Sequence, residues 1–285
     1  MPVSSRIPRL HLFEWNDLAW APAPLRDTLI EALSRALRWG GILRGLVGPF
    51  QRFLGESGAA EVLDLCAGAG GPARVLAHEL RRAGVAPPRF ILTDLFPRPE
   101  VWQEARAEHP GVIDFEPSPV DATRIPEALG ARRARVIING LHHFRPELAR
   151  SILADAARGS AGVFIAEGFD RNPLRFCTMW PAGVAALLAG PVLSPRDRLQ
   201  KALLTWATPA AFAVSAWDGF VSTLRVYTEA ELRAMVAPLG DDFRWEYGVY
   251  RYAPLGEGYY FYGVPTRRRP DHRRAGDASR DDIGL

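Results

Sequence analysis

The chain has 285 residues, 48% of them hydrophobic, which is enough to bury one substantial core. Its net charge is +3, and the segment 266–285 contributes +2 of it, with six arginines and four aspartates. The nearly neutral body lacks the basic stripe that phosphate contacts need, so nucleic-acid binding is not expected. Two cysteines do not make a disulfide framework, and no apolar segment suggests a signal peptide, so a cytoplasmic protein is expected.

The first 55 residues are expected to form an N-terminal segment apart from the sheet. Residues 12–20 are rich in aromatic and acidic side chains, which fits either a strap packed on the sheet edge or a lid over an active site. Leucines recur at every fourth position from Leu25 to Leu37, which predicts a helix with one apolar face. A second, shorter helix is expected to reach about Leu54.

The stretch 61–71, EVLDLCAGAGG, predicts a buried strand that runs into a glycine-rich turn. Pro72 suits the first position of a following helix, where a missing N–H costs nothing. Asp64 stands before the glycines, inside the end of the strand. A carboxylate there would repel a pyrophosphate and attract a cation, or the hydroxyls and amine of a nucleoside. The turn therefore predicts a nucleoside-type ligand that carries positive charge.

Strands and helices alternate through the following part of the chain. Further strands are expected at 89–94, at the residues before Asp121, at 135–139 and at 161–167, with helices at 72–82, 100–108 and 146–157. This alternation predicts a mostly parallel sheet, whose ligands bind at the carboxyl ends of the strands. Asp64, Asp94, Asp121 and Asn139 all fall at such ends, with Asp94 placed to accept hydrogen bonds from ribose hydroxyls.

Residues 176–194 and 202–217 form two uncharged runs on either side of a polar turn. Prolines and glycines interrupt both runs, which favours an inserted helical cap at about 170–222. A membrane-surface element and a transmembrane hairpin are the alternatives. Each would give the substrate apolar surroundings.

The last part of the chain is expected to return to the sheet and then to leave it. Thr228 and Glu231 form a capping box, which predicts a helix from Glu229 to about Val236. Two strands, 243–250 and 258–264, are expected to form an antiparallel ending. The polar tail 266–285 is expected to be disordered.

Together these features resemble the class I S-adenosylmethionine-dependent methyltransferases. The matching residues are the glycine motif from Asp64 to Gly71, the acids Asp94 and Asp121, and the segment Asn139-Gly-Leu-His-His-Phe144. The resemblance covers roughly residues 56–265. It implies an α/β Rossmann-like fold with a seven-stranded, mostly parallel sheet, flanking helices and a reversed last strand. Segments 12–20 and 217–225 are similar to those of a poorly characterised bacterial group within this superfamily.

The resemblance implies S-adenosyl-L-methionine as the cofactor and methyl transfer as the reaction. The uncharged runs of the cap indicate a small apolar or aromatic acceptor, and a role in specialised metabolism is expected. A regulatory or non-catalytic protein on the same scaffold, or an enzyme that uses this cofactor without methyl transfer, stays open. The cofactor is expected to contact Asp64, Cys66, Ala67, Gly68, Gly70, Asp94, Leu95, Asp121, Ala122 and Asn139.

The catalytic and acceptor-binding candidates lie outside the glycine motif. His143 and His142 follow the fourth strand and are candidates for a base, if the acceptor must lose a proton. The alternative is that one histidine caps a helix and the other packs. No metal site is expected, because adjacent histidines lack the spacing of a chelating pair.

Acceptor binding is expected to involve the N-terminal segment and the end of the cap. The candidates are Glu14, Trp15, Trp217, Asp218 and Arg225. The other interpretation of Asp218 and Arg225 is that they pair with each other, because buried charges are usually paired.

Overall fold

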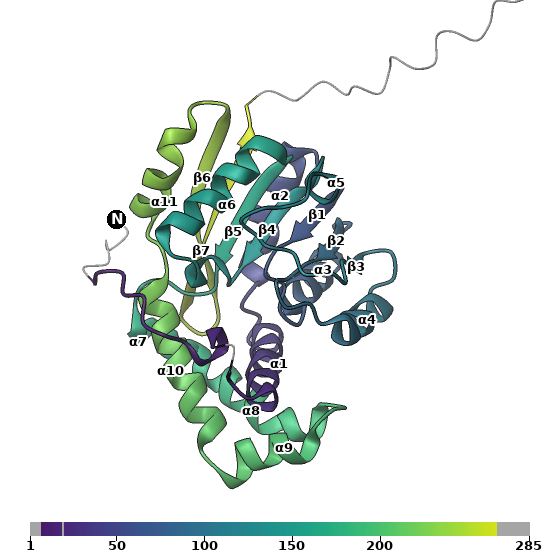
Figure 1. Cartoon of the computed structure of the whole chain (residues 1–285), viewed down its shortest axis with the longest axis vertical. Helices are drawn as coiled ribbons and strands as arrows, with labels where there is room; N and C mark the ends of the chain where they lie inside the picture. Colours follow the sequence, from purple (N-terminus) through teal and green to yellow (C-terminus); the bar gives the residue numbers. More distant parts are fainter. Residues whose placement is uncertain (1–6, 19, 267–285) are drawn as a thin grey trace, which may run out of the picture.

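A computed structural model describes residues 7–18 and 20–266 of the chain. Seven strands form one sheet in the order β3-β2-β1-β4-β5-β7-β6 (Figure 1). The strands are β1 Glu61–Asp64, β2 Arg89–Leu92, β3 Ile113–Phe115, β4 Ala134–Ile138, β5 Gly162–Glu167, β6 Phe243–Tyr252 and β7 Gly256–Pro265. The strand order reverses between β1 and β4, and in such sheets the reversal opens a crevice at the carboxyl ends of the strands.

Strands β1 to β5 pair in parallel, whereas β7 runs antiparallel to both β5 and β6. The predicted sheet with a reversed last strand is therefore confirmed. Strands β4 and β5 are buried along their whole length. They occur in the sequence as continuous apolar runs because helices cover both faces of the sheet.

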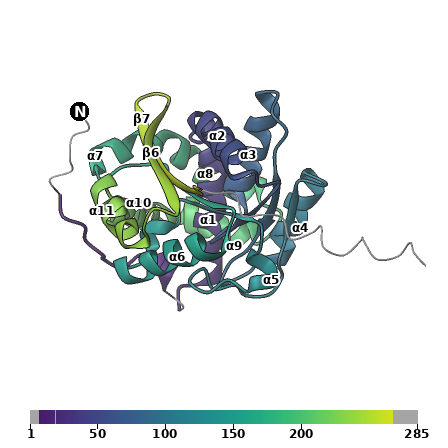
Figure 2. The ribbon, with the colours of Figure 1, turned by 90° about the horizontal axis from the view of Figure 1, so that it is seen from above.

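Helices occupy most of the rest of the described chain. The α-helices are α1 Ala23–Trp39, α2 Val47–Ser57, α3 Gly71–Arg82, α4 Pro99–Glu108, α5 Glu127–Gly130, α6 Pro146–Gly159, α7 Pro173–Phe176, α8 Trp180–Leu193, α9 Arg198–Ala202, α10 Ala210–Arg225 and α11 Glu229–Val236. Short 3-10 turns are η1 Trp15–Asp17, η2 Arg44–Leu46, η3 Leu141–His143, η4 Cys177–Met179 and η6 Ala237–Leu239, and η5 Leu203–Ala207 is a π-helix. Figure 2 shows α2 and α3 along one face of the sheet and α6 and α11 along the other.

Local signals in the sequence account for several helix ends. Thr228 and Glu231 form the predicted capping box, and α11 has the predicted bounds. Gly58 takes a left-handed conformation, with φ of 66°, just after α2. On α1, Leu25, Leu29 and Leu37 are buried, as one apolar face requires, whereas Leu33 of the same pattern is exposed.

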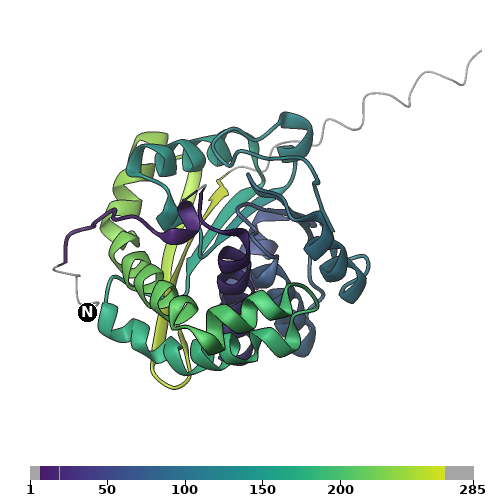
Figure 3. The ribbon, with the colours of Figure 1, turned by 60° about the horizontal axis from the view of Figure 1, so that its bottom comes forward.

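Helices α7 to α10, with η4 and η5 between them, form a layer that we call the cap (residues 173–225). Figures 1 and 3 show the cap at one end of the sheet, with α1 beside it. A separate apolar cluster joins α1 to α8 and α10, through Leu25, Leu29, Ala32, Ala36, Ala186, Leu187 and Ala211. The predicted helical cap is confirmed.

The apolar run in the cap bears on the membrane alternatives. The stretch 173–193 is long and apolar enough to cross a membrane by length and composition, and 28% of its most apolar window is buried. No second helix of this kind occurs in residues 7–18 and 20–266. A hairpin of two spanning helices is therefore not formed by the described chain, because the second run divides into η5 and the start of α10.

The strand expected to end at Asp121 was placed wrongly. Strand β3 ends at Phe115, and the chain then continues as a loop. Pro117 and Pro119 have no backbone N–H to donate to a neighbouring strand. The residues just before Asp121 therefore cannot continue the hydrogen-bond ladder of β3. Val120 instead donates its N–H to the Asp94 carbonyl at 2.9 Å, which holds the loop beside the end of β2.

Candidate active site

A cavity of about 1010 Å³ lies where the strand ends, α1 and the cap meet. Its walls come from the strap (residues 7–18), α1, the glycine turn, the loop after β2, η3, α8 and α10. Figure 3 shows the strap crossing this end of the molecule toward α1. Segments that are far apart in the chain, from Glu14 to Ser222, therefore contribute to one site.

The glycine turn forms one wall of the cavity, through Cys66, Ala67, Gly68 and Ala69. Cys66 and Gly68 have φ angles of 60° and 55°, so the turn is left-handed at both residues. A Cβ atom on Gly70 would lie 2.8 Å from the Leu92 side chain, so this position also needs glycine for space. Gly70 itself does not line the cavity but shapes the turn that does.

Asp64 lies behind the glycine turn and is buried. Its Oδ2 atom has no hydrogen-bond partner in the described part of the chain. Burial, with the nearby Asp94 charge, raises the pKa of Asp64 to about 8. A buried carboxylate without a partner favours a ligand that brings positive charge or hydrogen-bond donors.

Asp94 lines the cavity and is fixed by backbone groups on both sides. Its Oδ2 accepts from the Gly68 N–H at 2.9 Å and its Oδ1 accepts from the Phe96 N–H at 2.9 Å. A carboxylate has about four lone-pair positions, so acceptor capacity remains for a ligand. The Trp102 indole also donates to the Gly68 carbonyl at 2.9 Å, a support that the sequence did not reveal.

Asn139 lines the cavity at the end of β4, with φ of 54°. Its Oδ1 accepts from the Gly168 N–H at 2.6 Å, while its buried Nδ2 has no partner among the described residues. Besides Gly70, four expected cofactor contacts lie outside the cavity lining, namely Asp64, Leu95, Asp121 and Ala122. Asp121 accepts from the Thr123 N–H at 2.8 Å and so fixes its own loop.

The two histidines lie side by side at the cavity, with ring centroids 4.2 Å apart. His142 is buried, its Nδ1 lies 2.9 Å from Glu167 Oε2, and its backbone N–H donates to Glu167 Oε1 at 3.1 Å. His143 Nδ1 lies 2.9 Å from Asp17 Oδ1 and 3.6 Å from Glu14 Oε2. Burial lowers the pKa of His143, but Asp17 and Glu14 outweigh it and raise the pKa to about 9.

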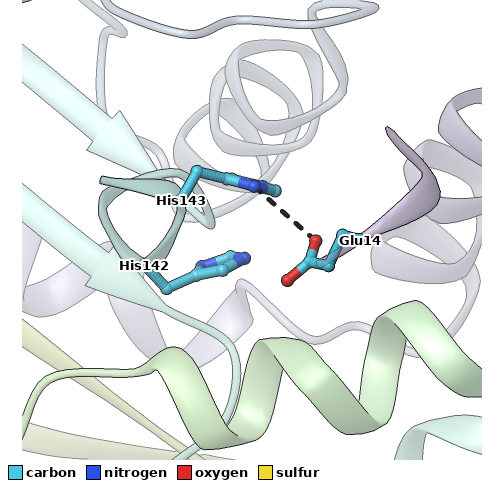
Figure 4. Close-up of side chains that lie close together, drawn as sticks. All are labelled: Glu14, His142 and His143. Atoms are coloured by element: carbon cyan, nitrogen blue, oxygen red, sulfur yellow. Dashed lines mark ion pairs between the residues drawn. The ribbon is translucent and has the colours of Figure 1, made fainter. Parts of the chain in front are cut away.

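Figure 4 shows Glu14 of the strap pointing toward both histidines. Glu14 is buried, and its Oε1 accepts from Ser222 Oγ at 3.1 Å and lies 3.2 Å from Arg225 Nη1. Arg225 also donates to Asp17 Oδ2 at 2.6 Å and to the Leu12 carbonyl. The sequence identified Glu14 and Arg225 as separate candidates, but it missed Asp17 and Ser222 and gave no sign that these residues form one cluster.

The expected pair between Asp218 and Arg225 is wrong. Asp218 accepts from the backbone N–H groups of Trp15 and Asn16, at 2.8 and 3.2 Å. Burial is the main cause that raises the pKa of Asp218 to about 6. Asp218 and Arg225 therefore do not pair with each other, because each binds the strap. Asp218 binds its backbone, and Arg225 binds Glu14 and Asp17.

The other candidates for acceptor binding divide into two groups. Glu14 and Asp218 line the cavity, whereas Trp15, Trp217 and Arg225 do not. The Trp217 indole donates to the Phe13 carbonyl at 3.0 Å, and its ring contacts that of Phe13. Trp217 therefore attaches the strap to α10 from outside the cavity.

Sequence reasoning gave part of the apolar wall and missed the rest. The uncharged cap segment predicted that Trp180, Leu187 and Phe212, on α8 and α10, would face the sheet or the acceptor, and all three line the cavity. Phe169 of the loop after β5, Phe176 of α7 and Met179 of η4 also line it and were missed. The uncharged run at 176–194 was the signal for part of this wall. Leu33 of α1 also lines the cavity. The leucine pattern predicted the helix that carries Leu33 but not its position at the cavity.

Neither a protein-family model nor a curated protein matches the chain. Among solved structures, an O-methyltransferase from neocarzinostatin biosynthesis, in complex with S-adenosylmethionine and 2-hydroxy-5-methyl naphthoic acid, has a TM-score of 0.50 and 14% identity. That match covers 88% of this chain and 60% of the other. Magnesium protoporphyrin IX methyltransferase from Synechocystis PCC 6803 has a TM-score of 0.45 and 15% identity, over 81% of this chain and 86% of that one.

At these identities the likeness is one of fold. The strand order, the reversed β7 and the glycine turn after β1 agree with it. The chain has the fold of the class I S-adenosylmethionine-dependent methyltransferases.

Proposed function

We propose that the protein transfers a methyl group from S-adenosylmethionine to a small apolar or aromatic acceptor. The observation that carries this proposal is one cavity that joins the glycine turn and Asp94 to the polar cluster at His143. Ligand pockets usually measure about 300–1,000 Å³. A volume of about 1010 Å³ therefore suits a nucleoside cofactor together with a small acceptor.

The residues of the glycine turn suit this cofactor. Asp64 lies behind the turn, and its buried Oδ2 has no partner among the described residues, which favours a cationic ligand in front of the turn. Asp94 offers acceptors for ribose hydroxyls, and Asn139 offers its buried amide nitrogen, Nδ2, as a donor. The loop of Asp121 and Ala122 is held to the end of β2, which makes it our candidate for the adenine side, together with Leu95.

When bound, S-adenosylmethionine supplies the methyl group from its sulfonium. The chain itself supplies position and exclusion of water. The aromatic side chains Phe169, Phe176, Trp180 and Phe212 would enclose a flat, apolar acceptor. Glu14 and Asp218 are the cavity-lining groups that would orient a polar group on that acceptor.

An acceptor that reacts through oxygen must lose a proton. His143 is our candidate for the residue that takes it, because its Nδ1 is held by Asp17 and the residue lines the cavity. With a pKa of about 9, His143 is protonated at neutral pH. In that state it would stabilise an acceptor oxyanion, and it would accept a proton only as the pH rises.

The test has two steps on the full chain. Calorimetry with S-adenosylhomocysteine and S-adenosylmethionine comes first, and we expect both to bind. Labelled S-adenosylmethionine is then offered with phenols, amines and carboxylic acids, including hydroxylated aromatic acids such as the one bound by the neocarzinostatin enzyme. Absence of heat with both compounds would overturn the cofactor proposal. Binding without transfer to any acceptor class would favour the regulatory alternative.

A further inference from the structure

Three side chains that could hold a metal ion meet at the cavity. The ligand atoms of Glu14, His142 and His143 all lie within 4.8 Å of one another. Figure 4 shows them converging from two segments, the strap and η3. We propose that this cluster binds a divalent first-row transition-metal ion, of which Zn²⁺ is the test case. The proposal departs from the sequence-based expectation of no metal site, which considered only the spacing of the two histidines.

His142 has the arrangement of a supported metal ligand. Its Nδ1 lies 2.9 Å from Glu167 Oε2, and both side chains are buried. Metal-binding histidines commonly donate one ring N–H to a carboxylate, which fixes the tautomer and leaves the other nitrogen for the metal. Since Glu167 engages Nδ1, the nitrogen left is Nε2. Figure 4 shows a ring nitrogen of His142 directed toward Glu14.

Glu14 is similarly fixed, with one oxygen left for a ligand. Its Oε1 is engaged by Ser222 and Arg225, and its Oε2 lies 3.6 Å from His143 Nδ1. That separation is longer than a good hydrogen bond. Two ligands of a tetrahedral zinc ion, each about 2.1 Å from the metal, lie roughly 3.4 Å apart. The gap between Glu14 Oε2 and His143 Nδ1 is therefore close to the size that a bridging metal would need. A metal ion there would replace the proton that His143 Nδ1 shares with Asp17 Oδ1, 2.9 Å away.

The charges around the cluster also favour a cation. Glu14, Asp17 and Asp218 place three carboxylates near one another, and Arg225 is the guanidinium that contacts two of them. A histidine must lose its extra proton to bind a metal. With both histidines neutral, these three carboxylates and one guanidinium leave a net charge of −2. A divalent ion would balance this charge, with imidazole and carboxylate ligands that suit zinc and its neighbours.

All three proposed ligands line the cavity, so a bound ion would keep open positions on that side. An acceptor oxygen bound there would lose its proton more readily. Activation of an acceptor by the metal rests on the proposed function, whereas the binding of the metal does not. A proton on His143 and a metal ion would compete for the same lone pair.

The test uses the full chain after treatment with a chelator, dialysed against Zn²⁺ at equilibrium. We expect one Zn²⁺ per chain, and binding at least about tenfold weaker for Glu14→Gln and for His143→Gln. His78→Gln is the matched control, because His78 is exposed on α3 and outside the cavity. Thermal melts of each metal-free variant verify that it is folded.

Visible absorption of bound Co²⁺ gives a second measurement that needs no variant. We expect Zn²⁺ to displace one Co²⁺ per chain and to abolish its absorption bands. Equal Zn²⁺ affinity in the wild type, Glu14→Gln and His143→Gln would overturn the proposal, as would a wild type that binds no Co²⁺. Calorimetry with S-adenosylhomocysteine on the metal-free chain tests the proposed function separately, because Asp64 and Asp94 are not among the metal ligands.

Discussion

His143 and Asp17 are joined by a contact of 2.9 Å between Nδ1 and Oδ1, although 126 positions separate them in the chain. Asp17 also accepts from Arg225 at 2.6 Å. One carboxylate thus connects the segment after β4, the strap and the last helix of the cap. The protonation of His143 is therefore coupled to the attachment of the strap.

The first prediction concerns this coupling. The pKa of His143 is raised from 6.5 to about 9, so its contribution to stability is present below pH 6.5 and is lost as the pH rises through 9. We expect the melting temperature of the wild type to fall across this range more than that of His143→Gln. A pH series of thermal melts measures the difference. Parallel curves for the two proteins would contradict the coupling.

The second prediction concerns Asp64. Its pKa is raised from 3.8 to about 8, so its ionisation destabilises the unliganded fold increasingly as the pH rises between these values. Asp64→Asn should therefore raise the melting temperature of the unliganded protein at pH 8, while it weakens binding of S-adenosylmethionine. Melts and calorimetry on the same samples measure both effects. A variant that loses stability at pH 8 would show that the carboxylate has a partner in the free protein.

The third prediction concerns Asp94. Hydrogen bonds to a charged group contribute about 1.5–3 kcal/mol and neutral ones about 0.5–1.5 kcal/mol. Asp94→Asn should therefore weaken S-adenosylhomocysteine binding by roughly tenfold, and calorimetry measures the change. Asp241→Asn is the control, because Asp241 is exposed and lies outside the cavity. Equal losses in the two variants would argue against a ribose contact.

The fourth prediction compares two glycines in the cap helices. A Cβ atom on Gly219 of α10 would lie 2.1 Å from the Phe176 ring, whereas one on Gly183 of α8 has nothing within 4 Å. Gly219→Ala should destabilise the protein by about 1–3 kcal/mol through overpacking. Gly183→Ala should stabilise it by about 0.5–1 kcal/mol, because alanine favours helix. Urea unfolding measures both, and a stabilised Gly219→Ala would show that α7 and α10 are not in contact.

Local signals made most of the sheet and several helices predictable. The capping box at Thr228 predicted α11, and the apolar runs predicted β4 and β5. Both signals are local, because each is formed by residues that are close together in the sequence. The prediction of a strand before Asp121 was wrong, and the reason is also local. Two prolines follow Phe115 and prevent the strand from continuing. The glycine turn was recognisable because left-handed residues and close packing restrict which residue types can occur there.

The polar cluster could not be predicted because its contacts are distant in the chain. Arg225 was identified, but its partners Glu14 and Asp17 come from the other end of the sequence. Lys201 follows the first uncharged run of the cap in a polar stretch of sequence, yet it is buried and donates to Glu31 Oε1 at 2.8 Å. A sequence pattern shows which charges exist, and only the tertiary fold determines how they pair.

The strap has a consequence for how this protein is made. Asp17 leaves the ribosome 208 residues before Arg225, the guanidinium that it binds. The carboxylate of Asp17 therefore stays hydrated, without its arginine, until α10 has been translated. Strands β1 to β5 precede α10 in the chain, so the cavity cannot close before all five have been synthesised.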